Sequence, residues 1–459
     1  MAYKLIVENY GKIEKAELEI SPLTLFVGDN NSGKSYLLSL IWTLFSGQGE
    51  SSICKGMKGL LEQKFSKLYS DLKNLLINQN LENEEFVVVN EEIIISIINE
   101  LLLMNKDELV KSIFNYEGMS IGRIEVKNKS NRHYVIKKEK EDEEAIQISV
   151  YIDDVRRIGF QFLKWMYSNE MEEPVTRLVE LIVDRFLRND FPRNATYYLP
   201  AARTGFMLAK NTINQVGRKK AFDNIVELDD ETKNIEVSPF PKPIIHFLDS
   251  MDNLNLEVND KNYKSHIELL DWINHNMTNG DVKCIDNNSG NIQYVPDGMK
   301  NGIPLRATSG VVTELAPLIL LLKYARFLQE ICYEEPEMCL HPQLQYQMAK
   351  LIIRMVNSGI NIVASTHSDI ILQHINNMSQ LYKAANDKER LESLGLENED
   401  LINVDKISVY QFHEENGKTN IDRIYPENNV FKIPTFSNAL KSILNQTLEV
   451  SDIVYGEEE

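Results

Sequence analysis

The chain of 459 residues has few of the features that would place a protein in a specialised class. Its four cysteines have no paired spacing, which argues against a zinc knuckle or a disulfide framework. No apolar run approaches the roughly 18 residues of a membrane span, and the first residues lack the basic and apolar blocks of a secretory signal. We therefore expect a cytoplasmic protein with no membrane partner.

Positive charge is also scarce. The chain has 49 Lys and Arg against 68 Asp and Glu, a net charge of −19 at pH 7. This balance argues against a protein that coats nucleic acid with its whole surface, although a local basic groove stays possible. The short cluster GRKKAF at 217–222 reads as a solvated loop. We find no internal repeat, no low-complexity tract and no heptad pattern long enough for an extended coiled coil.

What is present is an alternation of apolar strands and helices that predicts an α/β fold. LTLFVG at 23–28 reads as a strand buried on both faces, and the segment that follows it has helical spacing up to Gly47. EICYEEPE, NIVASTHS and ISVYQF, which begin at 330, 361 and 407, read as further strands. VVTELAPLILLLKYARFLQE, from 311 to 330, reads as a strongly apolar helix.

The clearest motif is GDNNSGKS at 28–35, which fits the phosphate-loop pattern G-x-x-x-x-G-K-[ST]. Its glycines let backbone amides turn toward a polyphosphate, and the following helix points its positive end at the same anion. We expect Lys34 to reach the β- and γ-phosphates of ATP and the Ser35 hydroxyl to ligate Mg²⁺. The other predicted nucleotide contacts come from Gly28, Asn30, Asn31, Ser32, Gly33 and Tyr36.

Hydrolysis needs more than this loop, because a carboxylate must hold the metal and another group must position water. Glu334 and Glu335 end a short apolar strand, at the sheet edge where the loop is expected to lie. We predict that Glu334 holds Mg²⁺, directly or through water, and that Glu335 polarises the attacking water. His367 follows a neighbouring strand and is predicted to contact the γ-phosphate or the water.

GDNNSGKS, YEEPEMCLHPQLQ and ASTHSD, in this order, resemble the ABC-type ATPases. They are most similar to the branch that contains the overcoming-lysogenisation-defect (OLD) nucleases, RecF and the SMC proteins, and EEPE…LHP resembles the OLD-like form. The resemblance implies a signature motif that completes the ATP site of a second protomer. RATSGVVTELAPLILLL matches its position, with Ser309 and Gly310 at a helix start, but lacks the second glycine and the glutamine of the family pattern. The resemblance also implies a D-loop from Cys339 to Pro342, with His341 near the dimer seam.

The resemblance covers residues 1–47 and about 197–425 and implies an ABC-type P-loop ATPase head. The stretch between them lies outside the resemblance and reads as a mostly helical insertion. Amphipathic helices are expected over 57–76 and 91–114, a solvated hairpin tip or loop at 137–146, and further helices up to Leu187. The predicted division is an N-terminal lobe of the head at 1–50, the insertion at 51–190, a C-terminal lobe at 191–425 with an inserted segment at about 206–290, and a C-terminal helix with an acidic tail at 426–459.

The residues after His367 read as a β-hairpin with an Asn-Gly turn and a final helix, so no Toprim nuclease domain is expected. Stand-alone OLD-like chains resemble the ATPase subunits of antiphage systems such as PARIS and Septu. The resemblance implies a homo-oligomer that forms around ATP and Mg²⁺, responds to DNA or a phage-derived trigger, and controls a separate nuclease or toxin encoded nearby.

There are two alternative functions. A RecF-like DNA-repair ATPase is the main alternative, and the acidic balance argues mildly against it. A GTPase or small-molecule kinase is disfavoured, because the nearest match to the guanine-reading N-K-x-D loop is NKDE at 105–108, which lies within a predicted helix and lacks Asp at the fourth place.

Overall fold

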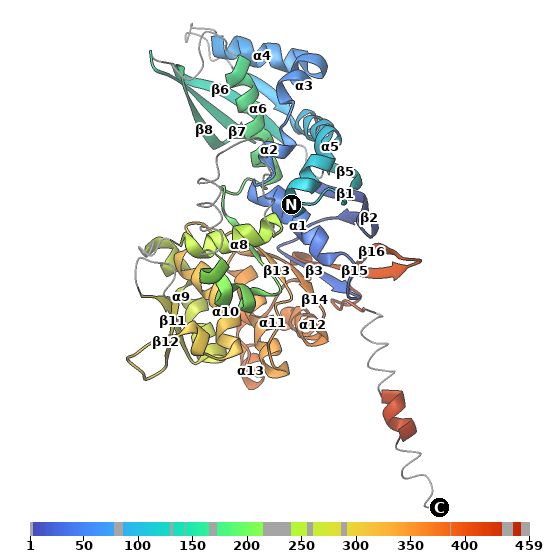
Figure 1. The fold of residues 1–459 in the computed structure, drawn as a ribbon, viewed down its shortest axis with the longest axis vertical. Helices are drawn as coiled ribbons and strands as arrows, with labels where there is room; N and C mark the ends of the chain where they lie inside the picture. Colours follow the sequence, from blue (N-terminus) through green and yellow to red (C-terminus); the bar gives the residue numbers. More distant parts are fainter. Residues whose placement is uncertain are drawn as a thin grey trace, which may run out of the picture. The chain divides into compact units, whose positions relative to one another are not determined.

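The computed structural model describes residues 3–77, 86–128, 132–141, 143–164, 172–213, 240–254, 260–285, 292–385, 387–433 and 444–450. The chain forms two compact units (Figure 1). Unit 1 contains residues 1–19, 39–197 and 237–243, and unit 2 contains residues 20–38, 198–236 and 244–459. The phosphate loop, both carboxylates, His367 and Ser309 all belong to unit 2, so the candidate site can be described within that unit.

Unit 2 is built on a mainly parallel sheet. β3 (Leu23–Gly28) lies between β14 (Asn361–Thr366) and β15 (Ile407–Glu415) and is parallel to both. β13 (Glu330–Glu334) continues the sheet beyond β14, followed by β9 (Thr196–Leu199), and β16 (Lys418–Ile424) forms an antiparallel hairpin with β15. Every residue of β3 and β13 is buried, as expected of parallel strands covered on both faces.

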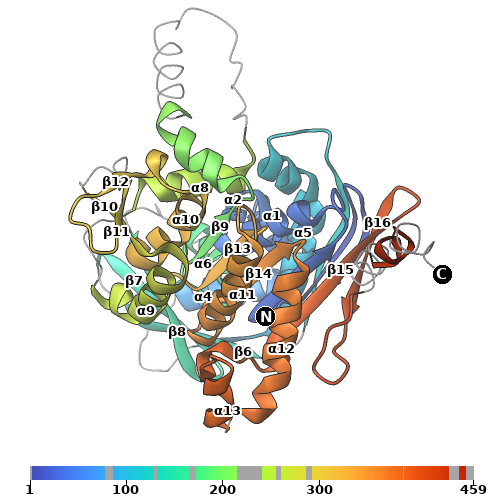
Figure 2. The ribbon, with the colours of Figure 1, turned by 90° about the horizontal axis from the view of Figure 1, so that it is seen from below.

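The helices that bear on the site directly precede or follow strands of this sheet in the sequence. α1 (Lys34–Ser46) begins directly after the phosphate loop, and α10 (Gly310–Tyr324) precedes β13. α11 (Pro342–Asn357) and α12 (Asp369–Leu381) pack side by side (Figure 2). Unit 2 also holds most of α8 (Lys242–Asp252), together with α9 (Asp260–Ile273), α13 (Lys388–Ser393) and a small sheet of β10 (Gly280–Cys284), β11 (Ile292–Pro296) and β12 (Ile303–Pro304).

Most predicted elements of unit 2 are confirmed, but the apolar helix before β13 is shorter than expected. α10 ends at Tyr324, where Ala325 turns to an extended conformation, rather than at 330. The chain must leave the helix there, because Glu330 already opens β13. The predicted hairpin is confirmed as β15–β16, with Asn416 and Gly417 at positive φ in its turn.

Unit 1 combines helices with two groups of strands. β1 (Tyr3–Tyr10) lies between β2 (Ile13–Leu18) and β5 (Ile121–Asn128), antiparallel to both. A second sheet has the order β4 (Phe86–Asn90), β6 (His133–Glu141), β7 (Ala145–Ile152) and β8 (Val155–Leu163). The helices are α2 (Glu50–Ile53), α3 (Met57–Lys64), α4 (Ser66–Ile77), α5 (Glu91–Phe114) and α6 (Glu172–Leu187).

The described part of the segment 51–190 therefore contains five strands as well as helices. The helices predicted over 57–76 and 91–114 are confirmed. The further helices expected up to Leu187 are confirmed only by α6, because β7 and β8 occupy the stretch before it. AIQISVYI alternates buried and exposed side chains over part of its length, which is the period of a strand. The prediction of a hairpin tip or loop at 137–146 is correct only for the centre of that range, because β6 extends to Glu141 and β7 begins at Ala145.

Some expectations fall outside the described residues. They are the basic cluster at 217–222 and most of the C-terminal helix and acidic tail, at 434–443 and 451–459. Among the helices that the structure does describe, none combines the length and apolar character needed to cross a bilayer.

Candidate nucleotide-binding site

The phosphate loop, residues 28–35, links the end of β3 to the start of α1. Gly28 and Gly33 have φ values of +129° and +93°, which glycine adopts readily, and Asn31 has φ +59°. A methyl carbon at Gly28 would lie 2.0 Å from the carbonyl oxygen of Phe412 on β15, so only glycine fits there. The loop is closed internally by the Ser32 hydroxyl, which donates to the Asp29 carbonyl oxygen at 2.7 Å.

Lys34 lies inside this loop. Its side chain is buried, and Nζ donates to the carbonyl oxygens of Gly28 at 3.1 Å and Asp29 at 2.5 Å and to the Ser32 hydroxyl at 3.2 Å. Burial lowers the pKa of Lys34 to about 8, an effect opposed by the negative charges of Glu335, Asp29 and Glu337. The ammonium therefore lies where a polyphosphate held by the loop would meet it.

The rim of the loop faces solvent. Asn30, Asn31, Ser35 and Tyr36 are exposed, whereas Ser32 and Lys34 are buried beneath them. The hydroxyl of Ser35, at the first turn of α1, is therefore accessible to a metal ion that accompanies a nucleotide.

Glu334 and Glu335 stand at the carboxyl end of β13. Glu334 is buried, and its Oε2 accepts a hydrogen bond from the Ala201 amide at 3.0 Å. Glu335 is half-buried and has φ +42°, a left-handed conformation that a side chain of this size rarely adopts. Its amide donates to the Ser365 carbonyl oxygen at 2.9 Å, which ties the turn to the end of β14. Strained backbone of this kind is typical of functional positions.

His367 follows β14 and is half-buried. Burial and the charge of Lys34 lower its pKa, while Asp29 and a hydrogen bond with the Gly28 backbone oppose that shift. These neighbours place the imidazole beside the phosphate loop. A neutral ring there can both donate and accept a hydrogen bond, as contact with a phosphate or a water requires.

Glu337 is a site residue that the sequence interpretation missed. Its Oε1 accepts from the backbone amide of His367 at 2.6 Å, and its Oε2 accepts from the Thr366 hydroxyl at 2.9 Å. Burial raises its pKa, and these two hydrogen bonds oppose the change. Glu337 therefore fixes the turn that carries His367. The last glutamate of EEPE was the available signal, but the pattern alone does not show which turn its side chain contacts.

Ser309 and Gly310 begin α10, and both are exposed. Ser309 is the N-cap, and its hydroxyl accepts from the Val312 amide at 3.4 Å. The predicted D-loop is exposed at Cys339, His341 and Pro342, whereas Leu340 is buried; Cys339 has φ +59°, and His341 is the N-cap of α11. Both segments are therefore accessible to a second chain.

The residues fit a magnesium nucleotide. The described part of the chain holds no group of three or more His, Cys, Asp or Glu that could bind a metal by itself. Mg²⁺ is usually held by one or two protein ligands together with phosphates and waters, which matches the set of Ser35 and Glu334. Lys34 and the amides of the phosphate loop would hold the phosphates.

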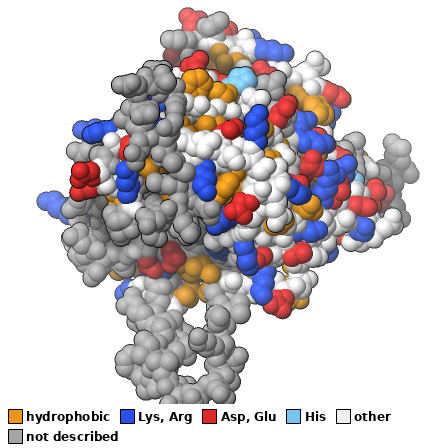
Figure 3. Space-filling model, turned by 90° about the horizontal axis from the view of Figure 1, so that it is seen from above, with side chains coloured by type: hydrophobic (Ala, Val, Ile, Leu, Met, Phe, Trp, Pro, Cys, Tyr) orange, Lys and Arg blue, Asp and Glu red, His pale blue; other side chains and the backbone are white. Residues whose placement is uncertain are grey.

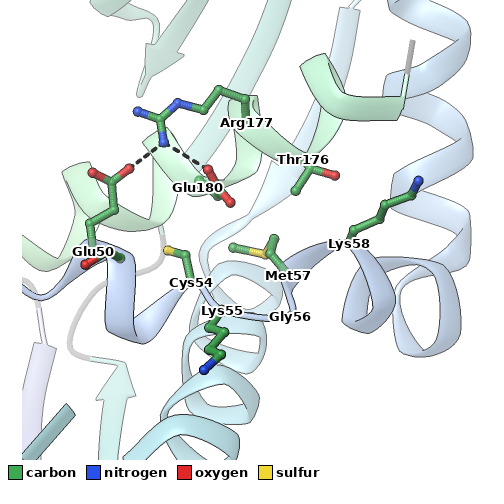
Figure 4. Close-up of a pocket in the computed structure, with 10 residues that line it drawn as sticks. Glu50, Cys54, Lys55, Gly56, Met57, Lys58, Thr176, Arg177 and Glu180 are labelled. Carbon is green, nitrogen blue, oxygen red and sulfur yellow. Dashed lines mark hydrogen bonds and ion pairs between the residues drawn. The ribbon is translucent and has the colours of Figure 1, made fainter. Parts of the chain in front are cut away.

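A different hollow lies within unit 1 and has another character (Figure 4). This groove of about 460 Å³ is lined by Cys54, Met57 and charged side chains, and Arg177 there contacts Glu50 at 2.7 Å and Glu180 at 2.9 Å. Burial raises the pKa of the Cys54 thiol, so it stays protonated and unreactive. The groove contains none of the predicted site residues.

Comparison with solved structures finds SMC head domains, at low similarity. The SMC head domain from Thermotoga maritima is 12% identical with a TM-score of 0.34, over 93% of this chain and 100% of that one. An SmcHead bound to the C-winged helix domain of ScpA is 12% identical with a TM-score of 0.36, over 92% and 97%. An Smc head domain with an extended coiled coil, bound to the C-terminal domain of ScpA derived from Pyrococcus furiosus, is 10% identical with a TM-score of 0.35, over 97% and 98%.

The family assignment rests on sequence instead. No curated protein matches the chain. The model of the AAA ATPase domain family matches residues 1–372, which include the phosphate loop, Ser309 and Gly310, the two carboxylates and His367. Because this match spans most of the chain, the protein belongs to the AAA ATPase domain family and is an ATPase.

Proposed function

We propose that ATP joins two copies of this chain, and that the closed assembly is a signal to a separate protein. The observation that supports this most directly is the exposure of Ser309 and Gly310 at the N-terminus of the otherwise buried helix α10. A helix N-terminus with free amides attracts anions, so these residues can complete the nucleotide site of another copy. Dimer formation would then depend on the γ-phosphate.

Within each site the residues have separate tasks. Lys34 stabilises the negative charge on the transferred phosphoryl group, and Ser35 and Glu334 hold Mg²⁺, which supplies further positive charge at the phosphates when bound. Glu335 orients and polarises the attacking water. His367 contacts the γ-phosphate or that water, and Glu337 keeps the His367 turn in place through two hydrogen bonds.

The proposed role is that of an ATP-dependent sensor and switch in bacterial antiphage defence. It is supported by the resemblance of EEPE…LHP to OLD-like ATPases, and the partner would be a nuclease or toxin encoded nearby. Co-expression of the chain with its neighbouring gene, followed by phage challenge, tests this role. Protection that is lost with Lys34→Ala is expected, and equal phage growth with and without the wild-type pair would contradict it.

A RecF-like DNA-binding ATPase is the alternative. On the face shown in Figure 3, basic and acidic side chains are interspersed rather than gathered into a basic stripe. Together with the net charge of −19, this favours a protein partner over DNA. Double-stranded DNA binding measured at two salt concentrations separates the two: tight binding with a steep salt dependence would favour the DNA-binding function.

Mixing two inactive variants tests the shared site. Lys34→Ala disables the phosphate loop, and Ser309→Arg places a bulky cation where the partner must close. A mixed dimer contains one intact loop facing one intact Ser309, so partial ATPase activity should return on mixing.

Because Ser309→Arg also removes an N-cap, worth about 1 kcal/mol, Ser309→Asp is the matched variant. It keeps the cap but places a negative charge against the γ-phosphate, so ATP should still bind while assembly is lost. A monomeric Ser309→Arg protein with full activity would refute the shared site.

A further inference from the structure

Arg203 is a fully buried cation next to the two motif carboxylates. It lies four residues after β9 and has 0% exposure. Its Nη1 donates to the carbonyl oxygens of Pro200 at 3.0 Å and Glu334 at 2.7 Å, and its Nη2 donates to that of Glu335 at 3.0 Å. The Tyr333 ring lies 4.7 Å below the guanidinium. Removing a cation from water is costly, so a buried arginine needs a set of fixed partners. Several of the partners of Arg203 lie at the C-terminal end of β13.

The contact with Glu335 holds a strained peptide. Glu335 has φ +42°, and its carbonyl oxygen also accepts from the Met338 amide at 3.0 Å. The direction of the Glu335 side chain depends on this backbone, and the water that it polarises must lie within hydrogen-bond reach. Arg203 therefore influences where the proposed general base points, although it touches no reacting group itself.

The remaining partner of Arg203 comes from α10. Its Nη2 forms an ion pair with Oε1 of Glu314, a side chain that is also 0% exposed. The Thr204 hydroxyl donates to the other Glu314 oxygen. Glu314 lies in the first turns of the helix whose exposed N-terminus carries Ser309 and Gly310. One buried ion pair thus joins the helix predicted to meet a second protomer to the backbone of Glu334 and Glu335.

We propose that Arg203 and Glu314 are positioning residues that couple closure of a second protomer on α10 to alignment of Glu334 and Glu335. Movement of α10 toward a partner's nucleotide shifts Glu314, and the guanidinium follows because its ion pair is buried. The two carbonyl groups that it holds then set the carboxylates for hydrolysis. This inference rests on the proposed ATP-dependent dimer, and the experiment keeps the two claims separate.

The test uses Arg203→Lys and Glu314→Gln in the full-length chain. Lysine keeps the charge but cannot reach two carbonyl groups and a carboxylate at once, whereas glutamine keeps the shape and removes the charge. Wild-type specific activity should rise with protein concentration as dimers form. In both variants ATP binding and ATP-induced association should persist, but kcat should fall roughly 10- to 100-fold with little change in KM, and the rise with concentration should disappear.

Arg354→Lys is the matched control. Arg354, in the last turn of α11, also forms an ion pair in unit 2, with the buried Asp400 at 2.7 Å. Among the bonds that the structure describes, none joins Arg354 to a carbonyl group of β13. The Arg354→Lys protein should be less stable, but its specific activity should still rise with protein concentration. If either single variant fails to fold, the double variant Arg203→Met with Glu314→Leu replaces the pair by apolar groups of similar size, which proteins often tolerate.

The outcomes are distinct. Unchanged kcat in Arg203→Lys or Glu314→Gln overturns the inference while leaving the dimer intact. Loss of association in these variants also overturns it, because the pair would then shape α10 rather than transmit its movement. The proposed dimer itself is refuted by a different result: a Glu335→Gln protein that binds ATP but does not associate when ATP is added.

Discussion

Replacing Gly28 by Ala is the sharpest test of the phosphate loop that the structure allows. The new methyl carbon would lie 2.0 Å from the Phe412 carbonyl oxygen and 2.9 Å from its carbon, far inside an ordinary contact of about 3.5 Å. Gly28 and Phe412 are paired across β3 and β15, so the strands must separate. β3 is buried along its whole length and β15 is buried from Ile407 to Phe412, so close packing opposes this shift.

The expected cost has three parts. Alanine at φ +129° loses about 1–2 kcal/mol from backbone strain. Overpacking adds about 1–3 kcal/mol, and a weakened ladder hydrogen bond adds about 0.5–1.5 kcal/mol. Gly417→Ala is the matched control, because Gly417 also has positive φ, at +78°, but nothing lies within 4 Å of its added carbon. The control should lose only the strain.

Hydrogen exchange of the β3 and β15 amides is the suitable assay, since it reports on one part of the chain without assuming two-state unfolding. The excess of about 1.5–4.5 kcal/mol in Gly28→Ala corresponds to roughly 10- to 2,000-fold less protection than in Gly417→Ala. ATP binding should be lost in Gly28→Ala and retained in the control. Equal protection in the two variants, with ATP still bound by both, would refute this account of the loop.

Four further outcomes are expected. Lys34→Ala should lower ATP hydrolysis about tenfold or more, measured as phosphate release, because the charge over the β- and γ-phosphates is lost; a wild-type rate would exclude the site. Glu335→Gln should bind ATP without turnover and accumulate an assembly visible by light scattering, whereas loss of binding would assign the metal to Glu335 instead of Glu334. The pKa of Lys34 is lowered to about 8, and bound phosphates would raise it again. ATP affinity, measured by calorimetry, should therefore be constant below pH 8 and fall by up to about tenfold per pH unit above it. Lys34→Ala should lack this slope. Glu337→Gln should keep ATP binding but lower kcat, because Gln weakens the bonds that fix His367; an unchanged kcat would remove Glu337 from the site.

The parts of the site that the sequence predicted are those in which local pattern and local structure coincide. Residues 23–35 form an apolar strand, a glycine loop and a helix start, and each step is visible in consecutive residues. Glu334 and Glu335 were placed by the rule that parallel strands end at one sheet edge. The structure brings Lys34, Glu335 and His367 together as that rule requires.

The parts that were missed depend on contacts between distant residues. Arg203 reads as one polar residue in a loop, and nothing near it in sequence shows that the carbonyl groups of Glu334 and Glu335, 131 and 132 positions away, accept its hydrogen bonds. The strands β7 and β8 were mistaken for helices because apolar residues in short runs fit both periods. Only strand pairing, of β7 with β6 and of β8 with β7, identifies these segments as strands.

The charge distribution explains why the loop is arranged around one lysine. Glu335, Asp29 and Glu337 are all close enough to act on the pKa of Lys34, so carboxylates outnumber the ammonium before any nucleotide arrives. A triphosphate that enters such a site meets repulsion as well as the attraction of Lys34 and the loop amides. Mg²⁺, if held by Ser35 and Glu334 as we propose, would offset that repulsion and so would contribute to binding as well as to hydrolysis. In the proposed site, this surplus of carboxylates would favour the magnesium complex of ATP over free ATP.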